Sequence, residues 1–183
     1  MWQKLYPLTF KALKLPVNFG SKSEYMQHPP KYEILLAEDN SLILKLELRS
    51  LKRLVKCPVK GFWQGGELID HLKQTANSEH LKLIFLDLNM PRVNGWDVLD
   101  FLEDFEYKNS IYVIVLSASM YEPDQKRALK YSRAIGYYDK FLDTQELSEI
   151  LDQEVLKSTF NFEFKELEEG ENTSCDQTLD FIS

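Results

Sequence analysis

The chain has 183 residues, of which 44% are hydrophobic and 13% aromatic, and it carries 22 basic and 29 acidic residues for a formal net charge of −7. This length fits one domain with extensions, the apolar content excludes a wholly disordered chain, and no apolar run approaches the ~18 residues of a membrane span. Because phosphate contacts require clustered Lys and Arg and the two distant cysteines fit a reducing compartment, we expect a soluble, cytoplasmic protein that binds no membrane and no nucleic acid directly.

The first 30 residues form an extension without clear periodicity, and we expect it to be disordered. It holds four lysines and one glutamate, for a local charge of +3. Met26 lies five residues before the start of the patterned region at residue 31. One hypothesis is that translation starts at Met26, and peptides from residues 1–25 in the native protein would overturn it. The other is a flexible basic arm.

Two strand and helix pairs open the patterned region. Residues 32–37 are apolar enough for a buried strand, and Glu38 and Asp39 follow it directly. From residue 41 to residue 54, apolar side chains recur at close to helical spacing. Residues 57–63 fit an edge strand, because the proline near its start cannot donate to a neighbouring strand. A glycine pair then leads into a second amphipathic helix.

The alternation of strands and helices continues to residue 157. The pattern predicts strands at 81–86, 110–116 and 134–141, and helices at 96–105, 123–132 and 144–157. Five strands that alternate with five helices indicate an α/β fold, a doubly wound parallel sheet covered on both faces. In such sheets, sites lie beyond the carboxyl ends of the strands. The residues that end each strand are therefore the first candidates for a site.

Polar residues end four of the five predicted strands. Glu38 and Asp39 follow the first, Asp87 the third, Ser117 the fourth, and Lys140 lies at the end of the fifth. If the sheet brings these strands together, three carboxylates meet, and they cannot all stay ionised without a cation. Oxygen ligands of this kind suit Mg²⁺. Together with a lysine and a hydroxyl, such a site can transfer a phosphoryl group to a carboxylate.

Residues 32–151 resemble the receiver domain of two-component response regulators. The segments that carry the resemblance are ILLAEDN, LIFLDLNMPRVNGWDVL, VIVLSAS and GYYDKF, which occur in the family's order and spacing. The resemblance implies a flavodoxin-like sheet with strand order 2-1-3-4-5 and a receiver domain over residues 31–157. It also implies a role for each matching residue.

By this resemblance, Asp87 is the phosphoacceptor. Mg²⁺ is held by the carboxylates of Glu38, Asp39 and Asp87 and the backbone carbonyl of Asn89. Ser117 and Lys140 bind phosphoryl oxygens, the small Ala118 leaves access to the phosphoryl group, and Tyr137 is the switch aromatic. For Tyr137, packing in a half-buried strand is the structural alternative.

The implied function is a phosphoacceptor of a two-component phosphorelay. The phosphoryl donor is a sensor histidine kinase or a histidine phosphotransfer protein, and the output is a contact with an unidentified downstream protein, without a DNA-binding output domain. Such a receiver is not an enzyme in the usual sense, since it assists only its own phosphorylation and dephosphorylation.

Two other functions stay open. A pseudo-receiver that mainly binds proteins is favoured by Phe141, because the family usually has a proline with a cis peptide after the lysine. A metal-dependent phosphatase or hydrolase would need a second catalytic acid near Asp87, and the obvious place is taken by Asn89, whose amide cannot donate or accept a catalytic proton as a carboxyl group would.

We expect residues 158–183 to form an acidic tail. At its start, residues 159–165 alternate like a strand, so that Phe160, Phe162 and Phe164 face one side. The remainder is acidic and fits a disordered segment. The tail is either a solvated segment around a marginal strand or a segment that binds a partner or its own domain.

Overall fold

The computed structural model describes residues 32–107, 111–119 and 121–165. The N-terminal extension, including the candidate start at Met26, lies outside these ranges. So does the acidic tail beyond residue 165.

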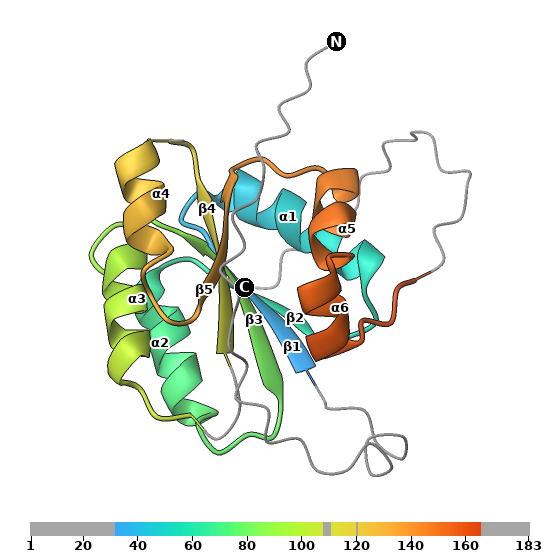
Figure 1. The fold of residues 1–183 in the computed structure, drawn as a ribbon, viewed down its shortest axis with the longest axis horizontal. Helices are drawn as coiled ribbons and strands as arrows, with labels where there is room; N and C mark the ends of the chain where they lie inside the picture. Colours follow the sequence, from blue (N-terminus) through green and yellow to red (C-terminus); the bar gives the residue numbers. More distant parts are fainter. Residues whose placement is uncertain (1–31, 108–110, 120, 166–183) are drawn as a thin grey trace, which may run out of the picture.

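Five parallel strands form a single sheet with the order β2-β1-β3-β4-β5, as Figure 1 shows. This order confirms the doubly wound fold that the sequence predicts. The strands are β1 (Tyr32–Ala37), β2 (Val59–Phe62), β3 (Leu81–Asp87), β4 (Ile111–Ser117) and β5 (Ala134–Asp139).

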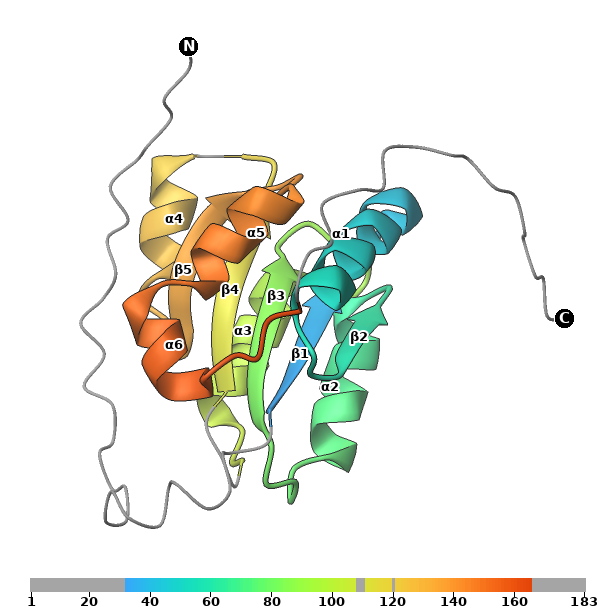
Figure 2. The same cartoon turned by 90° about the vertical axis from the view of Figure 1, so that its right-hand side faces the viewer.

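Helices cover both faces of the sheet (Figures 1 and 2). They are α1 (Ser41–Leu54), α2 (Gly65–Gln74), α3 (Gly95–Asp104), α4 (Glu122–Ala128), α5 (Thr144–Leu151) and α6 (Glu154–Phe160). Side chains of each strand point alternately to the two faces and fill two separate cores. One core lies under α1, α5 and α6, and the other under α2, α3 and α4. Within the described part of the chain, no helix is long and apolar enough to cross a membrane.

The last predicted helix, residues 144–157, is two helices in the structure. The chain leaves helical geometry at Gln153, whose backbone is extended, and α6 starts at the next residue. This break turns α6 so that Leu156 and Phe160 are buried on the sheet. The sequence pattern of the two helices is continuous enough to hide the break.

Residues 158–165 pack on the domain rather than extend from it. Phe160 is fully buried and stacks with Phe162, with ring centroids 5.2 Å apart. The expected strand is reduced to one antiparallel bridge between Val55 and Phe164. The sequence pattern predicts that the domain ends at residue 157. The packed part of the chain continues beyond it, because the rings of Phe160, Phe162 and Phe164 pack against the domain.

Candidate functional site

The carboxyl edge of the sheet gathers the polar residues that end the predicted strands. Glu38 directly follows β1, Asp87 ends β3, Ser117 ends β4, and Lys140 follows β5. The register aligns these ends, since Ala37 pairs with Leu86 on the neighbouring strand. Strands that are apart in sequence thus deliver their terminal side chains to one place, as the doubly wound topology predicts.

Three carboxylates meet at this edge. One oxygen each from Glu38, Asp39 and Asp87 lies within 4.8 Å of the others. Glu38 and Asp87 are each 1% exposed, whereas Asp39 is open to solvent. Two of the three anions are thus removed from water, which is unfavourable unless a positive charge compensates them.

Lys140 supplies part of that compensation. Its Nζ lies 2.7 Å from Asp87 Oδ2 and 3.0 Å from Glu38 Oε2. Among the described residues, these two oxygens have no hydrogen-bond partner besides this shared ion pair. One ammonium against three carboxylates leaves the group two negative charges in excess.

The chain's residues fit a divalent cation in this group. Carboxylate oxygens are the ligands that Mg²⁺ prefers, and a site with one exposed side can keep several of its waters. The excess charge and the two buried oxygens served only by Lys140 are the features that a cation would satisfy. Glu38, Asp39 and Asp87 would hold it.

The ionisation of the site reflects its burial. Burial raises the pKa of Glu38, while its hydrogen bonds to Lys140 and to the Asn40 amide oppose the rise. Burial alone would lower the pKa of Lys140, but its bonds to Asp87 and Glu38 outweigh that effect and raise it. Lys140 therefore stays charged at neutral pH.

The loop after Asp87 holds its carboxylate by backbone contacts. The amide of Asn89 donates to Asp87 Oδ1 at 2.9 Å, and the Gly95 amide donates to the Leu88 carbonyl at 3.0 Å. A Cβ on Gly95 would lie 2.2 Å from the Asp87 carbonyl oxygen, so only glycine permits this approach. Asn89 itself is exposed beside the acidic group.

The other candidate residues lie on β4, β5 and the loop after β4. Ser117 is buried, and its Oγ accepts a hydrogen bond from the Ser119 amide at 3.2 Å. Ala118 directly follows Ser117 and is exposed. Tyr137 is 4% exposed and donates its hydroxyl to the Ser119 carbonyl at 2.8 Å. Tyr137 is thus inward-facing and tied to the loop that follows Ser117.

The peptide bond between Lys140 and Phe141 is trans, and Lys140 still points into the acidic group. No cis bond occurs in the described ranges, and Lys140 still reaches both Asp87 and Glu38. The local adjustment is at Phe141 itself, whose φ is 67°, a left-handed value that disfavours a bulky residue. A phenylalanine after the lysine predicts either a strained cis bond or a trans backbone that aims Lys140 differently; the backbone is trans, and Lys140 nevertheless reaches Asp87 and Glu38.

The structure identifies a further buried carboxylate, Glu47, whose charge interacts with the site and which the sequence pattern does not single out. Glu47 lies on the inward face of α1, is 3% exposed, and has no hydrogen-bond partner for either carboxylate oxygen among the described residues. Burial raises its pKa to about 7, Glu38 and Asp87 add to the rise, and Lys140 opposes it. A glutamate at the inward spacing between Leu44 and Leu51 is the signal that could have identified it.

Comparison with known proteins agrees with this geometry. The family described as "Response regulator receiver domain" matches residues 34–152. The chain is 31% identical over 126 residues to the probable methanogenesis regulatory protein FilR2 of Methanothrix harundinacea, covering 67% of this chain and 80% of that protein. It is 32% identical to the nitrate/nitrite response regulator NarL of Escherichia coli, covering 66% of this chain but 53% of NarL. The chain thus spans only about half of NarL.

Solved structures show the same fold. A two-component response regulator from Cytophaga hutchinsonii is 25% identical, with a TM-score of 0.57, and the match covers 67% of this chain and 96% of that one. The receiver domain of Ssk1 from Saccharomyces cerevisiae, solved with the histidine phosphotransfer protein Ypd1, is 23% identical with a TM-score of 0.58, covering 72% and 90%. At that identity, the Ssk1 match shows the fold alone.

Proposed function

Because this chain belongs to the response regulator receiver family, we propose that it accepts a phosphoryl group on Asp87 from a histidine kinase or a histidine phosphotransfer protein. The observation that carries the proposal is the buried Asp87 carboxylate, which lies 2.7 Å from Lys140 inside an acidic group. An anion so placed has a cationic partner and lies among groups suited to a cation. That combination is typical of phosphoryl transfer to a carboxylate.

In the proposed reaction, a carboxylate oxygen of Asp87 attacks the phosphorus of a phosphohistidine. The phosphorus–nitrogen bond breaks, an acyl phosphate forms on Asp87, and the nitrogen's electron pair returns to the imidazole of the donor. Lys140 moves from the Asp87 carboxylate to an oxygen of the transferred group, and the Ser117 hydroxyl donates to another. Mg²⁺ held by the acidic group would neutralise the charge that develops on the phosphoryl oxygens.

The proposed output is a change in surface rather than turnover of a substrate. Ser117 currently accepts from the Ser119 amide, and Tyr137 donates to the Ser119 carbonyl. A Ser117 hydroxyl that turns to the phosphoryl group would disturb this loop, and Tyr137 would respond as the proposed switch aromatic. The chain would assist its own phosphorylation and dephosphorylation only, and signal to another protein through this region.

The proposed donor protein has an apolar surface to contact near the site. Leu42 and Leu46 on α1 are 64% and 56% exposed, and Phe141 is 66% exposed on the loop after β5. Exposed apolar side chains of this kind favour contact with a protein partner over a free metabolite. Ypd1, which was solved with the Ssk1 receiver domain, is an example of the kind of partner proposed.

Intact-mass measurement with acetyl phosphate tests the proposal. We expect a gain of one phosphoryl mass that requires Mg²⁺ and is absent in Asp87→Asn. Asp70→Asn is the matched control, because Asp70 is an exposed carboxylate on α2, outside the acidic group. Absence of the adduct in the unmodified chain, together with no binding of beryllofluoride, would overturn phosphorylation and favour the pseudo-receiver.

A further inference from the structure

The outer face of α1 is strongly basic in a chain that is acidic overall. We define the α1 stripe as the six exposed side chains on this face. They are Leu42, Lys45, Leu46, Arg49, Lys52 and Arg53. The one acidic residue of α1, Glu47, points into the core. The stripe therefore presents four cations and no anion, on a protein whose formal net charge is −7.

These four cations have no anionic partner in the part of the chain that the structure describes. The ion pairs of other lysines there include those of Lys60 with Glu33 and Lys126 with Glu122. Among the described residues, no such pair forms at Lys45, Arg49, Lys52 or Arg53. A row of unpaired cations on one helix face is complementary to an acidic segment.

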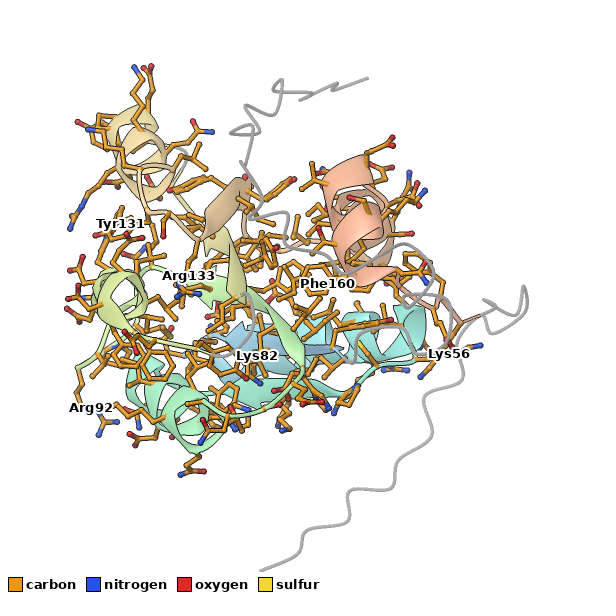
Figure 3. The ribbon with its side chains drawn as sticks, turned by 60° about the horizontal axis from the view of Figure 1, so that its bottom comes forward. Lys56, Lys82, Arg92, Tyr131, Arg133 and Phe160 are labelled. Atoms are coloured by element: carbon orange, nitrogen blue, oxygen red, sulfur yellow. The ribbon has the colours of Figure 1, made fainter. Side chains whose placement is uncertain are left out.

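The described part of the chain ends beside the stripe. The Lys165 amide donates to the Leu54 carbonyl at 2.7 Å, and Lys165 Nζ donates to the Lys52 carbonyl. Figure 2 shows residues 161–165 running to the end of α1, and Figure 3 labels Lys56 there. Residues 166–183 therefore start at the basic end of the α1 stripe.

The composition of residues 166–183 matches the stripe in the same order. They contain six acidic residues and no basic one, and four of the acids fall within residues 166–171. Leu179, Phe181 and Ile182 follow near the far end. On the stripe, the arginine and lysine cluster near Leu54 comes first and the apolar Leu46 and Leu42 come last.

The length of the segment is sufficient for this pairing. From Leu54 to Leu42 the helix rises about 18 Å, at 1.5 Å per residue. The 14 residues from 166 to 179 can span up to roughly 45 Å when extended. Attachment at Lys165 also raises the local concentration of the segment at the stripe to the order of millimolar.

We propose that residues 166–183 dock along the α1 stripe of their own chain, with their acidic residues on its cations and their apolar end on Leu46 and Leu42. The docked segment covers the helix that begins two residues after Asp39. The consequence for signalling rests on the proposed function: the segment competes with a donor protein for this face of α1 but leaves the site open to acetyl phosphate.

Nuclear magnetic resonance of the unphosphorylated full chain tests the docking without reference to phosphorylation. The variant replaces Glu166, Glu168, Glu169 and Glu171 by glutamine. We expect amide shifts at α1 residues between the two proteins, centred on Arg49 and Leu46, and we expect 0.5 M NaCl to shift the unmodified chain toward the variant because salt screens exposed charges. Identical α1 spectra would overturn the proposal.

A reciprocal change on the stripe identifies the contact. Lys45→Ala with Arg49→Ala should shift resonances of residues 166–183, while Lys126→Ala with Lys130→Ala, which also removes two exposed charges, should not. Equal effects of the two pairs would overturn docking at α1. If docking holds, the glutamine variant should accept phosphate from a phosphotransfer protein roughly fivefold faster or more, with an unchanged rate from acetyl phosphate. No increase with the donor protein would overturn the competition while leaving the docking result in place.

Discussion

The two ends of the parallel strands each hold a buried lysine paired with a buried carboxylate, but with opposite balance of charge. At the carboxyl edge, Lys140 is shared by Glu38 and Asp87, and Asp39 adds a third carboxylate. At the amino edge, Glu33 on β1 is shared by two lysines, Lys82 on β3 and Lys60 on β2. One edge has an excess of anions and the other an excess of cations.

The amino edge is closed by its own residues. Glu33 and Lys82 face each other in the register of β1 and β3 (Figure 3 labels Lys82), and Lys82 is fully buried. Its Nζ lies over the Tyr107 ring. Burial lowers the pKa of Lys82 to about 8. His71 Nε2 lies 3.7 Å from Glu33 Oε1, and burial lowers the pKa of His71, so this ring is mostly neutral at pH 7. Glu33 is therefore neutralised by lysines within the protein.

Buried charge alone therefore does not identify a binding site; buried charge that has no counter-charge within the protein does. At the amino edge, every carboxylate oxygen of Glu33 has a lysine beside it. At the carboxyl edge, two buried oxygens depend on one ammonium, and a further anion stands beside them. A cation binds where the protein leaves negative charge without a counter-charge. Removing a carboxylate at the amino edge should therefore lower stability and leave phosphorylation unchanged, whereas removing one at the carboxyl edge should raise stability and abolish phosphorylation.

The largest effect is expected from Glu33→Gln. The change leaves the fully buried Lys82 without its counter-charge, and breaking one partner of a buried ion pair destabilises by roughly 3–5 kcal/mol. Urea denaturation at pH 7 measures the free energy of unfolding, with Asp70→Asn as an exposed control that should change it by less than about 0.5 kcal/mol. Phosphorylation of the folded fraction by acetyl phosphate should be unchanged. A neutral effect of Glu33→Gln would contradict the closed role of the amino edge.

Glu47→Gln should have a pH-dependent effect of nearly this size. The folded pKa of Glu47 is about 7, against 4.5 in the unfolded chain, so folding binds a proton between these values and stability falls as pH rises through this window. The difference corresponds to about 3 kcal/mol once pH exceeds 7. Glutamine cannot ionise, so the variant should gain that much over the unmodified chain at pH 8 and almost nothing at pH 4.5.

Urea denaturation of both proteins at pH 4.5, 6 and 8 separates this effect from packing. A gain that is the same at all three values would indicate a change in packing instead of ionisation. Glu67→Gln is a control from the exposed start of α2, where the carboxylate accepts hydrogen bonds from the Trp63 amide and the Gln64 side chain. Its effect should not grow between pH 6 and 8.

Much of the fold and of the site follows from the sequence, for identifiable reasons. The strand ends give Glu38, Asp87 and Lys140 because a parallel sheet brings them to one edge. Glu33, Lys82 and Glu47 were missed because apolar periodicity treats a charged residue at an inward position as noise, and only packing reveals its burial. The turn of α6 at Gln153 was missed for a related reason, since burial of Phe160 and not local propensity sets it.

Asp87→Asn should stabilise the chain while abolishing phosphorylation. The change relieves repulsion with Glu38 at a site one lysine cannot neutralise, and we expect a gain of about 1 kcal/mol without Mg²⁺. Adding Mg²⁺ should stabilise the unmodified chain, by about 2.7 kcal/mol at 100 times its dissociation constant, and stabilise the variant less. Thermal unfolding with and without Mg²⁺ measures both changes. A loss of stability in Asp87→Asn without Mg²⁺ would show that the anions are already balanced.

The smallest effect on stability is expected at Phe141, the residue directly after Lys140. At φ 67° a side chain with a Cβ is disfavoured by roughly 1–2 kcal/mol, and glycine is not, although glycine also gains freedom in the unfolded chain. Phe141 is 66% exposed, so its removal forfeits little burial, and Phe141→Gly should raise the free energy of unfolding by about 0.5–1 kcal/mol. Phe141→Pro should do the reverse, because proline fixes φ near −65° and the backbone after Lys140 would have to change. If Phe141→Gly accepts phosphate from acetyl phosphate at the unmodified rate while Phe141→Pro does not, then it is the path of the backbone, and not the phenyl ring, that aims Lys140 at Asp87.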